Sequence, residues 1–262
     1  MRTSAVPDLS AVPAPTGPRW NWLHRVAAVA ALLSAVFIPI QIAVFLAWPP
    51  PLDGTAVDWF RLLREHRLAG LIDLDLLLVA DNVLLMPILL ALYLALRRAY
   101  PSVMLLAVTL GFASVGMYLT TNPAVQLAAL SDQYAAATTD AQRETATAAG
   151  TAMLAMWQGT AFHAGYLVGS TAGILLGAAM LGSGVFSRLT GWLAIAGNVM
   201  ALGLYVPAAG VFIAVFSVLF LEAWYVLIAA RLYRFGFAVG PSAARSRSSP
   251  GPGRPGPRRR WR

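Results

Sequence analysis

The sequence contains no cysteine and no lysine, and charged residues occupy only 11% of its 262 positions. Without cysteine the chain has no disulfide framework, no thiolate nucleophile and no cysteine-ligated metal. A typical soluble protein is about 25% charged, so this chain has too few charges to cover a water-facing surface of its size. Hydrophobic residues make up 58%. The composition therefore excludes an ordinary soluble domain and predicts that lipid surrounds most of the protein.

Catalytic signatures are also scarce. The only histidines are His24, His66 and His163, and no H-E-x-x-H zinc motif, P-loop or G-x-G-x-x-G motif occurs. The segment 111–116 resembles a nucleophile elbow only loosely, because Phe112 stands where that motif needs glycine. We expect no catalytic residue, metal site or cofactor. The sequence leaves enzyme status open and favours a non-enzymatic protein.

Long hydrophobic runs dominate what is present. A helix needs about 20 apolar residues to cross a hydrocarbon core of about 30 Å, and the alternation typical of barrel strands is missing. Six stretches qualify or come close: Arg25–Trp48, part of Leu68–Leu96, Val103–Leu119, Ala152–Leu181, Leu189–Val206 and Gly210–Ala230. We predict an all-α, polytopic bundle of six transmembrane helices over residues 25–235. The third and fifth stretches are the shortest, so five spans are the alternative.

The arginines predict how the bundle is oriented. Of the 19 arginines, nine lie between Arg231 and Arg262, so the net charge of +8 belongs to one tail and not to a nucleic-acid-binding surface. With the N-terminus inside, the Arg97–Arg98 turn and Arg188 are also inside, while no outer loop carries a net positive charge. We expect a protein of the bacterial cytoplasmic membrane with both termini in the cytoplasm.

The segments outside the spans carry further expectations. Residues 1–24 and 236–262 are predicted to be disordered cytoplasmic segments. The tail residues Arg258, Arg259, Arg260 and Arg262 are expected to contact anionic lipid head groups, at about 1 kcal/mol each. On the outer side, residues 57–68 predict a short interfacial helix. Asn122–Pro123 predicts a helix start and an outer helix to about Tyr134, and a second outer helix starts near Asp140.

Polar side chains inside the spans are the candidate functional residues, because an ionisable group in a bilayer is costly. We predict a polar cavity open to the outer face, lined by Gln41, Asp81, Asn82, Tyr118, Gln158, His163 and Glu222. Asp81 and His163 are its expected charged pair. The competing interpretation is interhelical hydrogen bonding without function. Under that interpretation Glu222 pairs with Arg188 or Arg231, and Asp73 and Asp75 are solvated at the outer interface.

Glycines recur at every fourth position of the fourth span, at Gly165, Gly169, Gly173 and Gly177. Such a stripe lets another helix approach closely. We expect the partner to be a helix of the same bundle, with a second copy of the chain, and hence a homodimer, as the alternative.

Several segments resemble one bacterial family. The quoted stretches are Met117–Pro123, Leu130–Thr138, Gln158–His163 and Phe186–Leu189, and they resemble the integral membrane proteins of domain-of-unknown-function family 4386. The resemblance covers about Arg25 to Arg234. It implies a protein with six spans and implies no activity.

The favoured function is a non-enzymatic membrane protein whose outward-facing polar cavity binds or senses a small ligand. The first alternative is a proton-coupled transporter of small molecules or ions that uses Asp81, His163 and Glu222. The second is a membrane-embedded enzyme.

Overall fold

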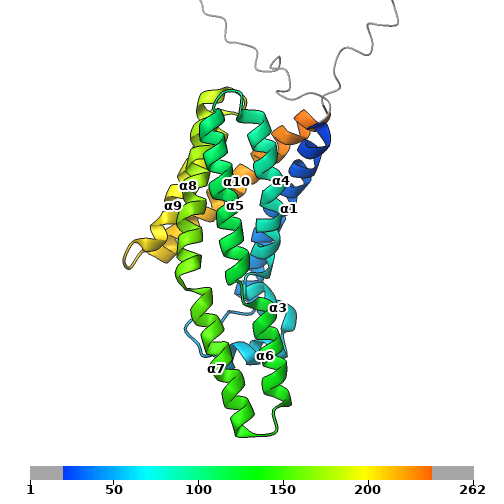
Figure 1. The fold of residues 1–262 in the computed structure, drawn as a ribbon, viewed down its shortest axis with the longest axis vertical. Coiled ribbons are helices and arrows are strands. Elements are labelled where there is room, and N and C mark those ends of the chain that lie inside the picture. The colour runs from blue at the N-terminus through cyan, green and yellow to red at the C-terminus, as the bar shows by residue number, and fades with distance from the viewer. Residues whose placement is uncertain (1–19, 238–262) are drawn as a thin grey trace, which may run out of the picture.

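The computed structural model describes residues 20–237, and every regular element in that range is helical. Six of the described helices form an elongated bundle, and four others form a cap at one end of it (Figure 1). The bundle comprises α1 (Asn21–Ala47), α4 (Leu76–Leu96), α5 (Pro101–Thr121), α8 (Thr160–Ser183), α9 (Arg188–Ala201) and α10 (Gly210–Phe237). The cap comprises α2 (Ala56–Glu65), α3 (Arg67–Asp73), α6 (Ala124–Ala136) and α7 (Asp140–Trp157).

Five helices or continuous helical segments are long and apolar enough to cross a membrane. Three of them are α1, α4 and most of α10, and the other two are the joined pairs α5–α6 and α7–α8. The predicted all-α class is confirmed for the described residues, and the apolar helices are consistent with a membrane protein. By itself α9 has only 14 residues, although a four-residue 3₁₀ turn, η3 (Leu202–Tyr205), extends it.

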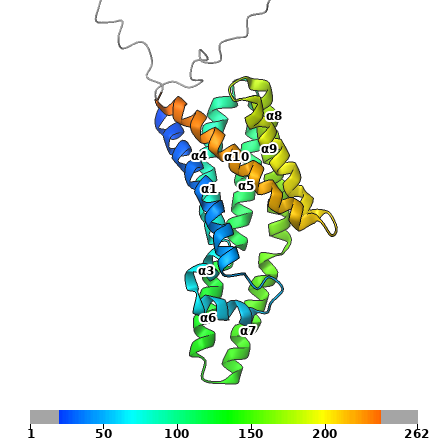
Figure 2. The same cartoon turned by 180° about the vertical axis from the view of Figure 1, so that it is seen from behind.

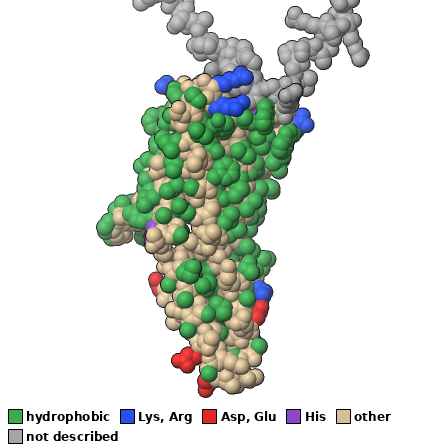
Figure 3. All heavy atoms as spheres, in the orientation of Figure 1, with side chains coloured by type: hydrophobic (Ala, Val, Ile, Leu, Met, Phe, Trp, Pro, Cys, Tyr) green, Lys and Arg blue, Asp and Glu red, His purple; other side chains and the backbone are tan. Residues whose placement is uncertain are grey.

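The outer surface of the bundle is also consistent with a membrane protein. Large apolar side chains are exposed along its helices, among them Leu33, Leu105, Trp192 and Leu219. On the face in Figure 3 they cover the bundle, whereas the visible acidic side chains lie on the cap and arginines gather at the opposite end. An apolar surface of this extent is not stable in water and requires a lipid or protein partner.

Two polar breaks separate the bundle from the cap. At the first, Pro123 interrupts the helical direction after α5, and the Asn122 side chain accepts from the Ala124 backbone N–H (3.1 Å) and donates to the Leu74 carbonyl (2.7 Å). At the second, α7 ends before Gln158–Gly159 and α8 begins at Thr160. The helices expected after Asn122–Pro123 and from Asp140 are therefore confirmed as α6 and α7.

The cap has a hydrophobic core of its own. Trp59, Phe60 and Leu63 on α2 pack with Leu127 of α6 and Trp157 of α7. The predicted helix near residues 57–68 is present, but its apolar face is buried in protein, so the expected interfacial role is wrong. An amphipathic pattern shows that one side is covered without showing whether lipid or protein covers it.

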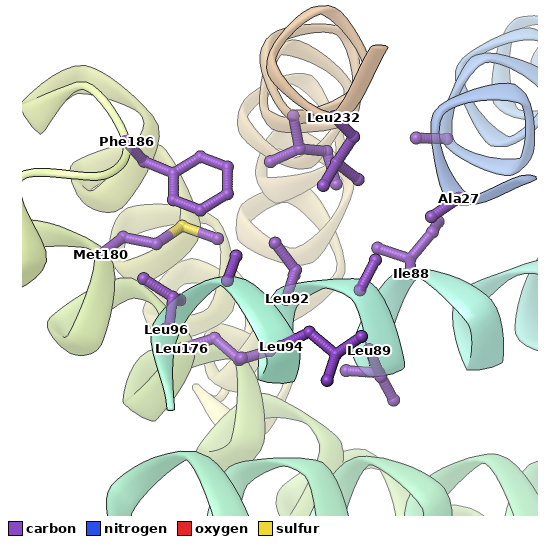
Figure 4. Packing of buried hydrophobic residues seen from close by; sticks show 14 of the residues in the cluster. Ala27, Ile88, Leu89, Leu92, Leu94, Leu96, Leu176, Met180, Phe186 and Leu232 are labelled. Carbon is purple, nitrogen blue, oxygen red and sulfur yellow. The ribbon is translucent and has the colours of Figure 1, made fainter. Parts of the chain in front are cut away.

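The bundle core is built from small residues on α1 and from leucines on α4. Ala27, Ala28 and Ala31 are fully buried on α1, which packs along α10. Leu92 and Leu96 of α4 point toward Leu232, Met180 and Phe186 in the same cluster (Figure 4). The start of α1 and the end of α10 lie side by side, and Arg25 of α1 donates its Nε–H to the Gly236 carbonyl of α10 at 2.8 Å.

The predicted domain boundaries need small corrections. Helix α1 begins at Asn21, so the last residues of the segment 1–24 are helical, and α10 extends to Phe237 and so includes the first two residues of 236–262. Both ends continue as helices because they pack against each other through Arg25, His24, Phe235 and Phe237. Residues 1–19 and 238–262, with Arg258, Arg259, Arg260 and Arg262, lie outside the described residues.

The glycine stripe of α8 packs within the chain, as expected. The first half of the stripe, Gly165 and Gly169, faces α5. A Cβ at Gly165 would lie 3.1 Å from Met117, and a Cβ at Gly169 would lie 2.5 Å from the Ser114 hydroxyl. The second half, Gly173 and Gly177, faces α9. A Cβ at Gly177 would lie 2.8 Å from the Gly191 carbonyl oxygen. Each glycine therefore permits a close approach of two bundle helices.

Gly177→Ala tests this packing. The added methyl group meets backbone, which cannot rotate away, so we expect a loss of about 1–3 kcal/mol of stability. The matched control is Gly116→Ala on α5, where a Cβ has no neighbour within 4 Å. Thermal unfolding in mild detergent should show a lower midpoint for Gly177→Ala and an unchanged or slightly higher one for Gly116→Ala. Equal midpoints for the two variants would contradict the packing role.

Candidate functional site

Buried polar atoms without a hydrogen-bond partner concentrate where the bundle meets the cap and in the layer above. Within residues 20–237 they occur in eight side chains. Seven of these lie on α1, α3, α4, α5 and α10: Ser34, Gln41, Asp73, Asp81, Tyr118, Glu222 and Trp224. Buried polar atoms are normally paired, so such a concentration requires an explanation.

The lower part of this region centres on Asp75. This residue links α3 to α4 and has φ +64°, a left-handed conformation that reverses the backbone before α4. Gln41, near the end of α1, donates its Nε2–H to Asp75 Oδ1 at 2.9 Å. The Tyr118 hydroxyl and the Trp157 indole also lie close enough to lower the pKa of Asp75. One hydrogen bond, from Gln41, and two nearby polar side chains thus surround the Asp75 carboxyl group.

Asp73 lies beside Asp75 and is only 1% exposed. Neither of its carboxyl oxygens has a partner among the described residues. The expected solvation of Asp73 at an interface is therefore wrong, because the break at Leu74–Asp75 turns α3 into the cap. Burial, together with the neighbouring Asp75 charge, raises the pKa of Asp73 to about 6, and burial raises that of Asp75 to about 6.

The upper part centres on Asp81, six residues further along α4. Tyr225 of α10 donates its hydroxyl to Asp81 Oδ2 at 3.3 Å, and Ser34 of α1 lies within reach of the same carboxyl group. Glu222 of α10 is close enough for its charge to interact with that of Asp81. Tyr118 is close to both Asp75 and Asp81 and so connects the two parts. We call Asp73, Asp75, Asp81 and Glu222 the carboxyl line.

No basic side chain neutralises the carboxyl line. The three ion pairs among residues 20–237 all lie in the cap, the strongest being the bidentate pair of Arg67 with Asp132 (2.8 and 3.0 Å). The expected pairing of Glu222 with Arg188 or Arg231 is wrong. Arg231 instead donates to the Val185 carbonyl at 2.9 Å and covers the Phe235 ring, near the other end of α10.

His163 lies apart from this line. It is exposed near the start of α8, and its Nδ1 is 3.1 Å from the Tyr205 hydroxyl at the end of η3. Phe162 and Tyr166 complete an aromatic group around it. Since Asp81 contacts Tyr225 instead, the predicted Asp81–His163 pair is wrong. The sequence indicates that Asp81 and His163 lie at about the same depth along their helices. It does not show which neighbouring helix each side chain faces, and the two face different ones.

Four of the seven predicted cavity residues come together: Gln41, Asp81, Tyr118 and Glu222. The other three do not, because Asn82 bonds its own helix at the Leu78 carbonyl (2.9 Å), Gln158 is exposed after α7, and His163 faces Tyr205. The sequence analysis missed Ser34 and Tyr225. Tyr225 had a usable signal, since it follows Glu222 by three residues and so shares a face of α10 with it.

Two cavities lie among the described residues without being lined by the predicted polar residues. A groove of about 350 Å³ lies on the cap beside Phe60, Arg61, Arg64 and Tyr134. A cavity of about 180 Å³ lies inside the bundle above Asp81, and none of the seven predicted residues lines it. Within the described range, no three His, Asp or Glu side chains are arranged to hold a metal ion.

Comparison with known proteins gives no family assignment, because no family model, no curated protein and no solved structure matches the chain. The resemblance to domain-of-unknown-function family 4386 therefore stays a prediction.

The raised pKa of Asp73 predicts a pH-dependent mutant effect. A native pKa of about 6 against 3.8 in the unfolded chain means that the native state binds the proton more tightly, so its contribution to stability is lost as pH rises from about 4 to about 6. We expect Asp73→Asn to raise stability at both pH values, by about 1 kcal/mol at pH 5 and by on the order of 2 kcal/mol at pH 7.5. Thermal unfolding at both pH values measures this.

The control for that experiment is Asp53→Asn, which replaces an exposed loop carboxyl. Its effect should be the same at pH 5 and pH 7.5. A similar gain from Asp53→Asn, or a pH-independent effect of Asp73→Asn, would contradict the assignment.

Proposed function

We propose that the chain is a membrane protein that conducts protons across the bilayer, and that the carboxyl line binds these protons and passes them between the cap and the middle of the bundle. The observation that carries this proposal is the set of unpaired polar atoms around Asp73, Asp81 and Glu222, none of which forms an ion pair with a basic side chain among residues 20–237. This proposal develops the first alternative from the sequence analysis, a proton-coupled transporter. Asp75 takes the place that the sequence analysis gave to His163.

A proton is the counter-charge that suits this line best. An ionised carboxylate in a low-dielectric interior needs a basic side chain, a metal ion or a proton. Basic side chains are missing from the neighbourhood, and the described carboxyl groups form no metal cluster. Intramembrane chains of acidic residues are typical of proton relays in pumps and transporters. Gln41 and Tyr225 supply hydrogen bonds that can orient Asp75 and Asp81 without adding charge.

We further propose six spans with both termini in the cytoplasm, so that the cap is outside. The contact between Arg25 and Gly236 brings the start of α1 and the end of α10 together, which favours an even number of crossings. The views in Figures 1 and 2 show both described ends opposite the cap. The arginines gathered at that end agree with the positive-inside rule.

Helix α9 supports the sixth crossing when η3 is included. Together the two elements extend about 29 Å, close to the thickness of the hydrocarbon core. The bond between Tyr205 and His163 brings the end of η3 level with the first turn of α8, so α9 and η3 descend along almost all of α8.

Proton passage can be measured directly after reconstitution. Liposomes with an entrapped pH-sensitive dye and an imposed potassium diffusion potential should acidify faster with the wild type than without protein. We expect Asp81→Asn to reduce the rate about tenfold, because it removes the central titrating group. The matched control is Asp140→Asn, an exposed cap carboxyl, which should keep the wild-type rate.

Two results would contradict the proposal. One is a wild-type rate equal to that of empty liposomes with folded protein present. The other is an unchanged rate in Asp81→Asn.

The absence of native cysteine allows a clean topology test, because a single introduced cysteine is the only thiol. We expect a membrane-impermeant maleimide to label Thr138→Cys and Ala209→Cys on intact cells and to label Ala99→Cys only after the membrane is opened. All three positions are exposed. If α9 does not cross, Ala209→Cys will instead behave like Ala99→Cys, and six spans would be excluded.

A further inference from the structure

The cavity of about 180 Å³ inside the bundle lies beyond the carboxyl line, among α4, α5, α8, α9 and α10. Leu85 and Leu89 form its wall on α4, one and two helical turns after Asp81. Its described lining residues carry no charge. A cavity of this kind suits an uncharged molecule, because an ion placed there would lack a counter-charge.

Glycines shape the cavity. A Cβ at Gly111 would lie 2.8 Å from the Leu89 side chain, and a Cβ at Gly173 would meet the side-chain amide of Asn198. Because position 173 has no side chain, the Asn198 amide can lie against α8 at the cavity wall. The glycine at position 173 thus lets the polar amide group of Asn198 reach the wall of an otherwise apolar cavity.

The wall offers unused hydrogen-bonding capacity. The indole N–H of Trp224 is buried and has no acceptor. Asn198 uses one amide hydrogen, which it donates to the Ala194 carbonyl at 2.8 Å, and keeps a second hydrogen and its carbonyl oxygen. Ser114 donates its hydroxyl to the Gly165 carbonyl at 2.8 Å and keeps its acceptor capacity. Donors and acceptors are therefore both available to one small polar group.

We propose that this cavity binds a small, neutral, hydroxyl-bearing molecule of about the size of phenol. An apolar cavity of about 150 Å³ accommodates benzene, so one of about 180 Å³ accommodates a ring with one substituent. The apolar part lies against Leu85, Leu89 and the glycine walls. Its hydroxyl group donates to the free carbonyl oxygen of the Asn198 side chain or to the Ser114 hydroxyl.

Tyr225 connects this site to the carboxyl line. Its side chain lines the cavity and donates to Asp81, so a bound molecule contacts a residue that orients a titrating group. The binding site does not depend on proton passage, since it is defined by the cavity and its wall. Equilibrium binding therefore tests it separately from the proposed function.

The experiment measures binding of 4-fluorophenol and fluorobenzene to the full chain in lipid nanodiscs by fluorine NMR. Partitioning into lipid is linear in concentration, so only a saturable component reports the site. Ala172→Leu places extra volume on the cavity wall, and Leu85→Phe does the same from α4. The matched control is Ala178→Leu, which makes the same change at an exposed position of α8.

We expect saturable binding of both probes to the wild type and to Ala178→Leu, and its loss in Ala172→Leu and Leu85→Phe. Asn198→Leu should weaken 4-fluorophenol binding about tenfold and leave fluorobenzene nearly unchanged, because only the phenol uses the side-chain amide of Asn198. No saturable binding to folded wild type would overturn the proposal. Equal binding to wild type and to both folded cavity-filling variants would also overturn it, as would equal effects of Asn198→Leu on the two probes.

Discussion

A carboxyl group inside a membrane bundle must have a partner for its charge, and in this protein the residues around Asp81 offer hydroxyl and amide groups instead of cations. Tyr225 holds one oxygen of Asp81, and Gln41 holds one oxygen of Asp75. Neither contact neutralises a charge. Arg25 and Arg231, at the end of the bundle opposite the cap, instead donate to backbone carbonyls. This separation of acids from bases leaves the proton as the counter-charge in our account.

The cap and the bundle depend on each other through two broken helices. The α5–α6 and α7–α8 segments extend about 54 Å and 66 Å, well beyond a hydrocarbon core of about 30 Å. Their breaks, together with the reversal at Asp75, lie where the cap begins. Trp157 at the end of α7 belongs to the cap core and also reaches Asp75. A movement of the cap would therefore change the environment of the first carboxyl groups in the line.

The architecture was largely predictable, because hydropathy, helix-breaking residues and arginine placement are local signals. The runs of apolar residues predicted all six bundle helices, and Asn122–Pro123 predicted the start of α6. The contacts between polar side chains of different helices were less predictable, because they depend on which face of each helix meets which neighbouring helix. Asp81 and His163 lie at similar estimated depth yet face Tyr225 and Tyr205, respectively. The burial of Asp73 and of the apolar face of α2 depends on the cap core, which forms between segments far apart in the sequence.

The most direct test of the central claim is the infrared spectrum of the purified protein at pH 5, below the raised pKa of Asp73 and Asp75, recorded in H₂O and in D₂O. A protonated carboxyl group has a carbonyl stretch distinct from that of an ionised carboxylate, and it shifts on deuteration. Our account predicts such a band in the wild type and its decrease in Asp81→Asn, with no decrease in Asp140→Asn. A wild-type spectrum that contains only ionised carboxylate bands would contradict the proton as the counter-charge of the carboxyl line.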